Sequence, residues 1–271
     1  MQKLCMMIMV SMLCVSNTFG MEQLSQDVSQ SYGIDKKMMF GFMNAHDHTE
    51  FIKENPHIIN AWVQPVGSSH DSYTLLHCMV EKDKVVAVRT LLEAGAQSNI
   101  ATQGCKHTSL HMVRSKEMAE LLLEYKEDLE NKDKNGKTPL YHVLFNRDIN
   151  TNYSGYFDIR SHEHQEMIKK RNELAYYLLE QGANSNAVDN DERSLLHRSI
   201  GGQCSWDWSY PQYLTWLMRF SADIEIKDSN GKTPYDLAID RIGKCKEILE
   251  VLRAYNIADS TSKCISNIDA S

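Results

Sequence analysis

Histidine and acidic side chains cluster at two places in the sequence, where they could supply ligands to a metal ion. These places are His162-Glu163-His164 and His46-Asp47-His48. Histidines two residues apart share one face of a strand but diverge on a helix, and the segment leading into Met167 has a helical pattern. A zinc site also needs third and fourth ligands from elsewhere in the chain. We therefore interpret both clusters as exposed polar segments and expect no metal site and no cofactor.

Other patterns that carry catalysis are missing from the sequence. No serine or cysteine lies in a nucleophile-elbow pattern, no glycine-rich loop could cradle a phosphate, and no Cys-x-x-Cys pair occurs. We therefore expect a protein that is not an enzyme. A metal-dependent hydrolase, built on the histidines near residue 162, stays open as a third class of function that metal analysis would reveal.

The first 20 residues have the features of a cleaved secretion signal. Lys3 precedes an apolar run from Leu4 to Val15, and small residues stand three and one positions before Met21. A helix of 12 residues spans about 18 Å, too little to cross a hydrocarbon core of about 30 Å. A buried or amphipathic N-terminal helix is one alternative, and lipidation at Cys14 is another. We predict that residues 1–20 are a signal peptide and that the mature protein is exported, either secreted or periplasmic, without stable membrane insertion.

Charge and cysteine usage restrict the partners and the redox chemistry of the chain. Lys and Arg number 29 against 36 Asp and Glu, a formal net charge of −7. An acidic chain without a basic stripe argues against nucleic acid and anionic membranes as partners, so we expect an unknown protein partner and a monomeric chain. Five cysteines follow the leader, so in an oxidising compartment at least one thiol stays free or pairs between chains.

Aromatic side chains are concentrated in the segment from Cys204 to Tyr213. It contains Trp206, Trp208 and two tyrosines. Such a group is typical of the anchors of a protein interface, but it could equally fold back as a small satellite core. The sequence leaves both interpretations open.

A Thr/Ser-x-(Leu/Tyr) opening recurs five times along the chain. Each opening follows a turn, and a leucine pair or a related apolar pair comes after it in the sequence. The openings are Thr74-Leu75-Leu76-His77, Thr108-Ser109-Leu110-His111, Thr138-Pro139-Leu140-Tyr141, Ser194-Leu195-Leu196-His197 and Thr233-Pro234-Tyr235-Asp236. The answering pairs are Leu91-Leu92, Leu122-Leu123, Leu178-Leu179, Leu217-Met218 and Val251-Leu252.

Both halves of this pattern, recurring in order, resemble the ankyrin repeat, which is a turn followed by two antiparallel helices. The resemblance implies an all-α solenoid of about five repeats plus an N-terminal cap, with helix pairs joined by short hairpin turns. We assign residues 21–36 to a linker and 37–258 to the repeats, with insertions near 146–170 and 201–213. Residues 259–271 read as a polar, disordered tail.

The openings predict how each first helix is capped. The Thr or Ser hydroxyl can cap the first turn, and in the family the following histidine bonds back toward the turn. His77, His111 and His197 match that histidine and predict a histidine brace, meaning a hydrogen bond from the histidine back to the turn. Tyr141 and Asp236 replace the histidine in the third and fifth repeats, so the sequence does not predict the brace there.

Turns and helix ends require backbone of positive φ at defined places. The Asn-Gly pairs at 135–136 and 230–231 suit the hairpin turns, and Gly95 and Gly182 suit left-handed C-caps. Lys126, Ser221 and Tyr255 occupy the corresponding place in the other repeats. If they adopt the same backbone, each costs about 1–2 kcal/mol relative to glycine.

The resemblance also implies where a partner binds. Members of the family contact proteins through hairpin tips, which here lie around Gln103, Lys134, Asn135, Asn190 and Ser229. The competing site is the aromatic segment with Trp206 and Trp208. A leader on such an array is similar to exported ankyrin proteins of host-associated bacteria, so we expect a non-enzymatic scaffold that binds a host or partner protein. The alternative is a periplasmic scaffold or protective partner of a resident envelope enzyme.

Overall fold

A computed structural model describes residues 34, 36–63, 72–145, 162–201 and 210–240. The helices of this part are α3 (Lys36–Met43), α4 (His48–Glu54), the 3₁₀ helix η1 (Pro56–Ile58), α5 (Leu75–Glu81), α6 (Val85–Glu93), the 3₁₀ helix η2 (Ser109–Met112), α7 (Lys116–Glu124), α8 (Pro139–Phe145), α9 (His162–Glu180), α10 (Leu195–Gly201), α11 (Tyr210–Arg219) and α12 (Pro234–Asp240). The strands are β1 (Trp62–Val63) and β2 (Tyr73–Thr74).

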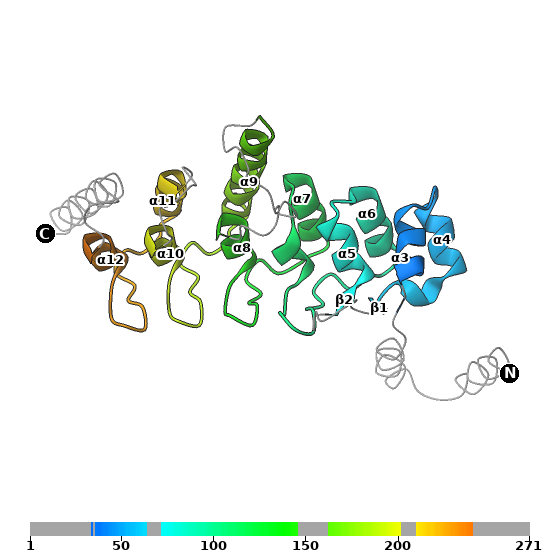
Figure 1. Cartoon of the computed structure of the whole chain (residues 1–271), viewed down its shortest axis with the longest axis horizontal. Helices are drawn as coiled ribbons and strands as arrows, with labels where there is room; N and C mark the ends of the chain where they lie inside the picture. Colours follow the sequence, from blue (N-terminus) through cyan, green and yellow to red (C-terminus); the bar gives the residue numbers. More distant parts are fainter. Residues whose placement is uncertain (1–33, 35, 64–71, 146–161, 202–209, 241–271) are drawn as a thin grey trace, which may run out of the picture.

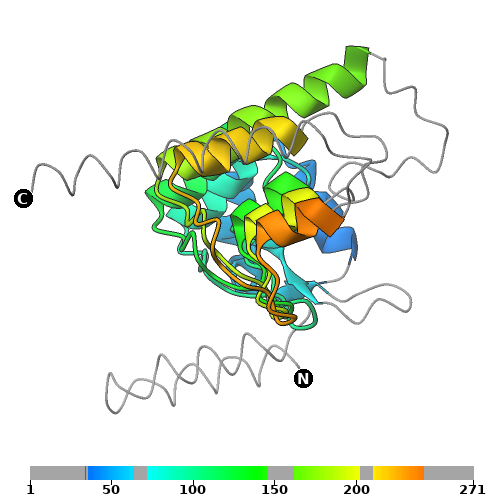
Figure 2. The same ribbon diagram turned by 90° about the vertical axis from the view of Figure 1, so that its left-hand side faces the viewer.

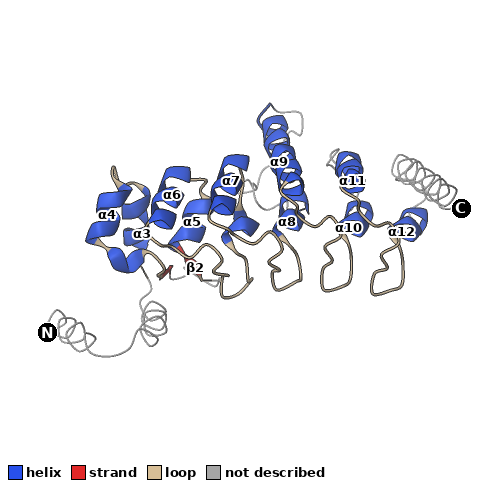
Figure 3. Cartoon of the chain, turned by 180° about the vertical axis from the view of Figure 1, so that it is seen from behind, coloured by secondary structure: helices blue, strands red, loops and turns tan. Residues whose placement is uncertain are grey.

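The helices pair and the pairs stack side by side into an elongated row (Figure 1). The pairs are α3–α4, α5–α6, η2–α7, α8–α9 and α10–α11, followed by α12. Loops between successive pairs descend to a single edge of the row, as Figure 3 shows in tan beneath the helices. Seen along the row, these loops superimpose below the two layers of helices (Figure 2). This is the helix-pair architecture that the repeat pattern predicts.

The two strands of the described residues lie at the N-terminal end of the row, and an isolated antiparallel bridge joins Val188 to Ser194 in the fourth repeat. β1 and β2 pair antiparallel with Trp62 opposite Thr74 and Val63 opposite Tyr73. Ile34 adds a parallel bridge to Val63. Because two-residue strands contribute little, the fold is essentially all-α, as expected.

Leucines of both helix layers form one continuous core between neighbouring pairs. The second helices supply Leu91, Leu122, Leu178 and Leu217, which are fully buried. In α7 the buried pair is Leu121 and Leu122, while Leu123 is only half-buried, so the pair expected at 122–123 lies one residue earlier. A helix in such a stack buries its apolar face only against its neighbours, so the core extends along the whole row. Val251-Leu252 lies outside the described residues.

The predicted histidine brace forms and extends from one repeat to the next. In the first opening, the Thr74 amide and hydroxyl both donate to His77 Nδ1, at 3.2 and 2.7 Å, which completes a capping box. Since Nδ1 accepts, Nε2 carries the proton and donates to His107 O in the next turn at 3.2 Å. His111 and His197 repeat this arrangement, with Nε2 on Lys137 O and Lys232 O. Each histidine therefore ties its own helix start to the following hairpin.

The two repeats without this histidine differ from each other. In the fifth repeat, the Asp236 carboxylate accepts from the Thr233 amide and hydroxyl at 2.9 and 2.8 Å, so it replaces the local half of the brace. In the third repeat, Thr138 Oγ1 is buried and has no hydrogen-bond partner within the described part of the chain. Tyr141 instead packs edge-on against Phe145, so packing holds the start of α8.

Backbone of positive φ occurs where the second helices end. Gly95 and Gly182 have φ of 94°, and Lys126 and Ser221 have φ of 60° and 61°, as the sequence predicts. Asparagines of the preceding repeat bond to these strained positions, with Asn99 Nδ2 on Lys126 O at 3.3 Å and Asn186 Nδ2 on Ser221 O at 3.3 Å. Tyr255 lies outside the described residues.

Candidate functional site

Hairpin turns of four successive repeats line up along one edge of the array. We define this hairpin edge as residues 102–107, 132–137, 188–193 and 227–232. In the third turn, Asp133 Oδ1 accepts from the amides of Asn135 and Lys137 at 2.7 and 2.9 Å. Asp189 and Asp228 fold the fourth and fifth turns with equivalent pairs of bonds. An inward aspartate thus shapes each of these turns and leaves the tip outside.

Backbone hydrogen bonds join each hairpin to the one before it. Lys134 N donates to Cys105 O at 3.0 Å, Asn190 N to Asn135 O at 2.9 Å, and Ser229 N to Asp191 O at 3.0 Å. At the N-terminal end, Gln103 N donates to Ser72 O at 3.3 Å. The structure therefore brings the five predicted tip residues onto one edge, and all five are exposed.

Asn190 has a fixed role within this edge. Its Nδ2 donates to Lys134 O at 3.0 Å, while a side chain at Gly136, whose φ is 79°, would collide with Asn190 Oδ1. A side chain at Gly136 or loss of the Asn190 side chain would therefore weaken the contact between the third and fourth hairpins. The side chain of Asn190 therefore holds the tips in place, whereas Gln103, Lys134 and Ser229 contribute only backbone groups to the bonds between hairpins.

The hairpin edge presents mostly cations although the chain is acidic overall. Its exposed charged side chains are Lys106, Lys132, Lys134, Asp191, Glu192, Lys227 and Lys232. Asp133 and Asp228 are buried beneath the turns and do not reach the surface. Burial raises the pKa of Asp228, but amide hydrogen bonds from Lys232 and Asn230 outweigh it and hold that pKa below its usual value. The inward acids thus stay ionised as turn acceptors while lysines face outward.

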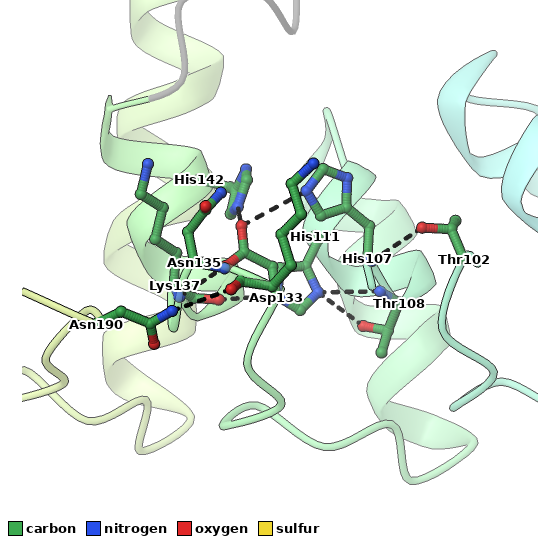
Figure 4. Close-up of polar contacts among 10 residues, drawn as sticks. Thr102, His107, Thr108, His111, Asp133, Asn135, Lys137, His142 and Asn190 are labelled. Carbon is green, nitrogen blue, oxygen red and sulfur yellow. Dashed lines mark hydrogen bonds and ion pairs between the residues drawn. The ribbon is translucent and has the colours of Figure 1, made fainter. Parts of the chain in front are cut away.

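A cluster of histidines and one carboxylate lies directly behind the third tip (Figure 4). His107 precedes the cap of η2, Asp133 opens the third turn, and His142 belongs to α8. Asp133 Oδ2 lies 3.0 Å from His142 Nε2 and 3.6 Å from His107 Nε2. One ligand atom from each of the three residues can be chosen so that all lie within 4.8 Å of one another. These are side-chain types that could hold a metal ion.

Burial and hydrogen bonds set the charge states within this cluster. Burial raises the pKa of Asp133, but hydrogen bonds from His142 and from the amides of Lys137 and Asn135 outweigh it, so the pKa lies well below its usual value. The neighbouring His111 stacks on His107, with ring centroids 5.6 Å apart. Burial, followed by the repulsion of His142, lowers the pKa of His111 to about 3. His111 is therefore a neutral brace beside an ionised carboxylate.

Sequence reasoning missed this cluster because it searched for histidines close together along the chain. His107 and Asp133 are 26 residues apart, and Asp133 and His142 are 9 apart. The available signal was the repeat register, which places the residue before one helix cap beside the turn aspartate of the next repeat.

The two histidine clusters found from sequence lie elsewhere in the fold. Asp47 caps α4 through the amides of Thr49 and Glu50, and His162 is exposed in the first turn of α9.

Two other sequence predictions concern the aromatic segment and the cysteines. Trp206 and Trp208 lie outside the described residues, as do residues 146–161 of the third repeat. Cys78 and Cys105 form no disulfide bond, and burial raises the pKa of Cys78 to about 12, so the Cys78 thiol stays protonated and unreactive.

Comparison with known proteins found two similar sequences, both from fowlpox virus (strain NVSL) and each named "Putative ankyrin repeat protein". One is 31% identical over 87 residues, which cover 31% of this chain and 56% of that protein. The other is 33% identical over 96 residues, which cover 33% of this chain and 26% of that protein. The chain thus matches only about half and a quarter of the length of these relatives. No protein-family model matches the chain.

Together the repeat motifs, the stacked helix pairs and these similarities make the fold an all-α ankyrin-repeat solenoid. The similar proteins are viral, so the expected likeness to exported bacterial proteins stays a prediction. Among the described residues, none of the helices combines the length and apolar character needed to cross a bilayer.

Proposed function

We propose that this protein is a non-enzymatic scaffold that binds another protein through its hairpin edge. The observation that carries the proposal is the row of exposed tips, Gln103, Lys134, Asn135, Asn190 and Ser229, which hydrogen bonds between repeats hold in register. A rigid, repeated edge presents many polar groups in one orientation, so little conformational entropy is lost when a partner binds. The names of the similar proteins agree with a repeat protein of this kind.

Charge on the hairpin edge favours a partner surface with acidic groups. Exposed lysines at 106, 132 and 134 flank the second and third tips, while Asp191 and Glu192 occupy the fourth. Asp191 is partly neutralised by an ion pair with Arg193 at 3.3 Å. Complementary charge speeds encounter and selects the register of binding more than it adds affinity.

Export is the second part of the proposal. The leader at residues 1–20 supports a protein that leaves the cytoplasm and meets a host or partner protein outside it. Fractionation of the native source tests this part. Recovery of mature protein in the medium or host agrees with it, whereas recovery in the periplasm favours the envelope scaffold.

Placing a negative charge at three tips is expected to abolish partner binding without unfolding the array. The variant is Gln103→Glu, Lys134→Glu and Ser229→Glu, chosen because these side chains are exposed and only the backbone atoms of these residues serve the bonds between hairpins. The partner is first captured from native material with the unmodified protein and identified by mass spectrometry. We expect affinity for it to fall at least about 100-fold, since interface energy is concentrated in few residues.

A matched control carries the same change of charge on the second-helix side of the array. Gln97→Glu, Lys170→Glu and Gln181→Glu replace exposed residues outside the hairpin edge. Both variants should retain the melting temperature within a few degrees, because exposed substitutions rarely change stability by more than about 0.5 kcal/mol. Equal loss of binding in both variants would contradict the assignment of the binding surface to the hairpin edge. So would loss of the partner in a Trp206→Ala, Trp208→Ala double variant while the tip variant still binds.

A further inference from the structure

We propose that His107, Asp133 and His142 form a binding site for a divalent transition-metal ion such as Zn²⁺. The inference is independent of the proposed protein-binding function. It rests on the convergence of three ligand residues from two repeats on one point behind the third hairpin (Figure 4).

Two of the three separations between ligand atoms are close to those of tetrahedral coordination, and all three are at most 4.8 Å. Zinc bonds to histidine nitrogen and carboxylate oxygen are about 2.0–2.1 Å long, which places neighbouring ligand atoms roughly 3.3 Å apart. Asp133 Oδ2 lies 3.6 Å from His107 Nε2 and 3.0 Å from His142 Nε2, on either side of that value. The two imidazole rings meet edge to face, with centroids 4.8 Å apart. A metal ion would replace the hydrogen bond between His142 Nε2 and Asp133 Oδ2.

Surrounding hydrogen bonds already hold the side chain of Asp133 and the backbone of His107. Asp133 Oδ1 is held by the amides of Asn135 and Lys137, so Oδ2 is the oxygen that faces the histidines. The backbone of His107 is fixed on both sides by Thr102, whose amide donates to His107 O and whose hydroxyl accepts from His107 N. Partners of this kind fix ligand orientation in metal sites and raise metal affinity.

The exposure of the three side chains indicates where an ion would enter, and three protein ligands leave the fourth tetrahedral position open. The side chain of Asp133 is 1% exposed and that of His142 8% exposed, whereas that of His107 is 22% exposed. An ion would therefore enter past His107, and a water molecule or a partner's side chain would complete the tetrahedron. Two imidazoles and one carboxylate favour Zn²⁺ and its transition-metal neighbours over Mg²⁺ or Ca²⁺, which prefer sets of oxygen ligands.

Binding would join two repeats that otherwise meet through hydrogen bonds and packing. His107 belongs to the second repeat, and Asp133 and His142 belong to the third. Because the unfolded chain does not hold these ligands together, the ion would stabilise the folded array. It would also lie beside Lys134 and Asn135, at the centre of the hairpin edge.

The test uses the purified full chain, freed of metal by a chelator and titrated with Zn²⁺ in a calorimeter. We expect saturation at one ion per chain and a rise in melting temperature of about 5–10 °C at 100 times the dissociation constant. His107→Gln and His142→Gln each keep an N–H donor for Asp133 but remove a ligand. Each should weaken Zn²⁺ binding about 100-fold or more, whereas His57→Gln, at an exposed histidine, should leave it unchanged.

A second measurement does not depend on the variants folding. Co²⁺ added to the unmodified protein should show the visible bands of a tetrahedral ion with nitrogen and oxygen ligands. Absence of saturable binding would overturn the proposal. So would a thiolate-to-cobalt charge-transfer band, which would place the ion on cysteine, or binding that survives in the doubly substituted His107→Gln, His142→Gln protein.

Discussion

Leu122→Ala should lower the free energy of unfolding by about 2–5 kcal/mol and the melting temperature by about 5–15 °C. Leu122 lies in α7 near the middle of the array and is fully buried in the continuous core. Alanine would leave a cavity between α7 and its neighbours, and rigid helix pairs on both sides can close it only in part. Chemical denaturation monitored by circular dichroism measures the change.

The adjacent leucine provides the matched control. Leu123 is half-buried in the same helix, so Leu123→Ala should cost only about 1 kcal/mol. If the two substitutions had equal effects, the register of α7 described here, with Leu121 and Leu122 inward, would be incorrect.

Glu127→Gln should change how the stability of the array depends on pH. Glu127 is buried, and its Oε1 accepts from Leu110 N at 2.6 Å at the start of η2. Burial raises its pKa from 4.5 to about 8, against the hydrogen bonds from Leu110 and Thr108. Between these values the folded chain keeps a proton that the unfolded chain releases. This contribution to stability is complete below pH 4.5 and is lost as pH rises toward 8, at up to about 1.4 kcal/mol per pH unit.

Glutamine retains the acceptor for Leu110 N but does not titrate. The stability of the variant relative to the unmodified protein should therefore rise by about 5 kcal/mol between pH 4.5 and pH 9. His111, whose lowered pKa reduces stability as pH falls below about 6.5, is common to both proteins and cancels in the difference. Denaturation should be measured in the presence of a chelator. Parallel stability curves for the two proteins would show that Glu127 is ionised in the folded state.

Repetition explains how much of the fold could be predicted from sequence. His77, His111 and His197 each follow a Thr or Ser by three residues, and one local hydrogen-bond pattern satisfies all of them. The same holds for Lys126 and Ser221, whose place after a leucine pair required positive φ. Local hydrogen bonds and backbone angles of this kind depend on residues that are close in sequence, so they can be predicted without a structure.

Contacts between repeats could not be predicted in the same way. The pairing of His107 with Asp133 depends on the offset between neighbouring repeats, and the bond from Asn190 to Lys134 O joins residues on either side of the insertion near 146–170. The short 3₁₀ helix η2, in place of an expected first helix, fits the compact second repeat but was not distinguishable from a short α-helix by residue pattern. The position of the exposed edge could be predicted, whereas the structural role of the Asn190 side chain within it could not.

Hydrogen–deuterium exchange of the free and partner-bound protein tests the central claim most directly. If the hairpin edge is the binding surface, amide protection should increase within residues 102–107, 132–137, 188–193 and 227–232 and remain unchanged along α6, α7 and α11. Protection confined to the segment from Cys204 to Tyr213, with no change at the hairpin turns, would contradict the account.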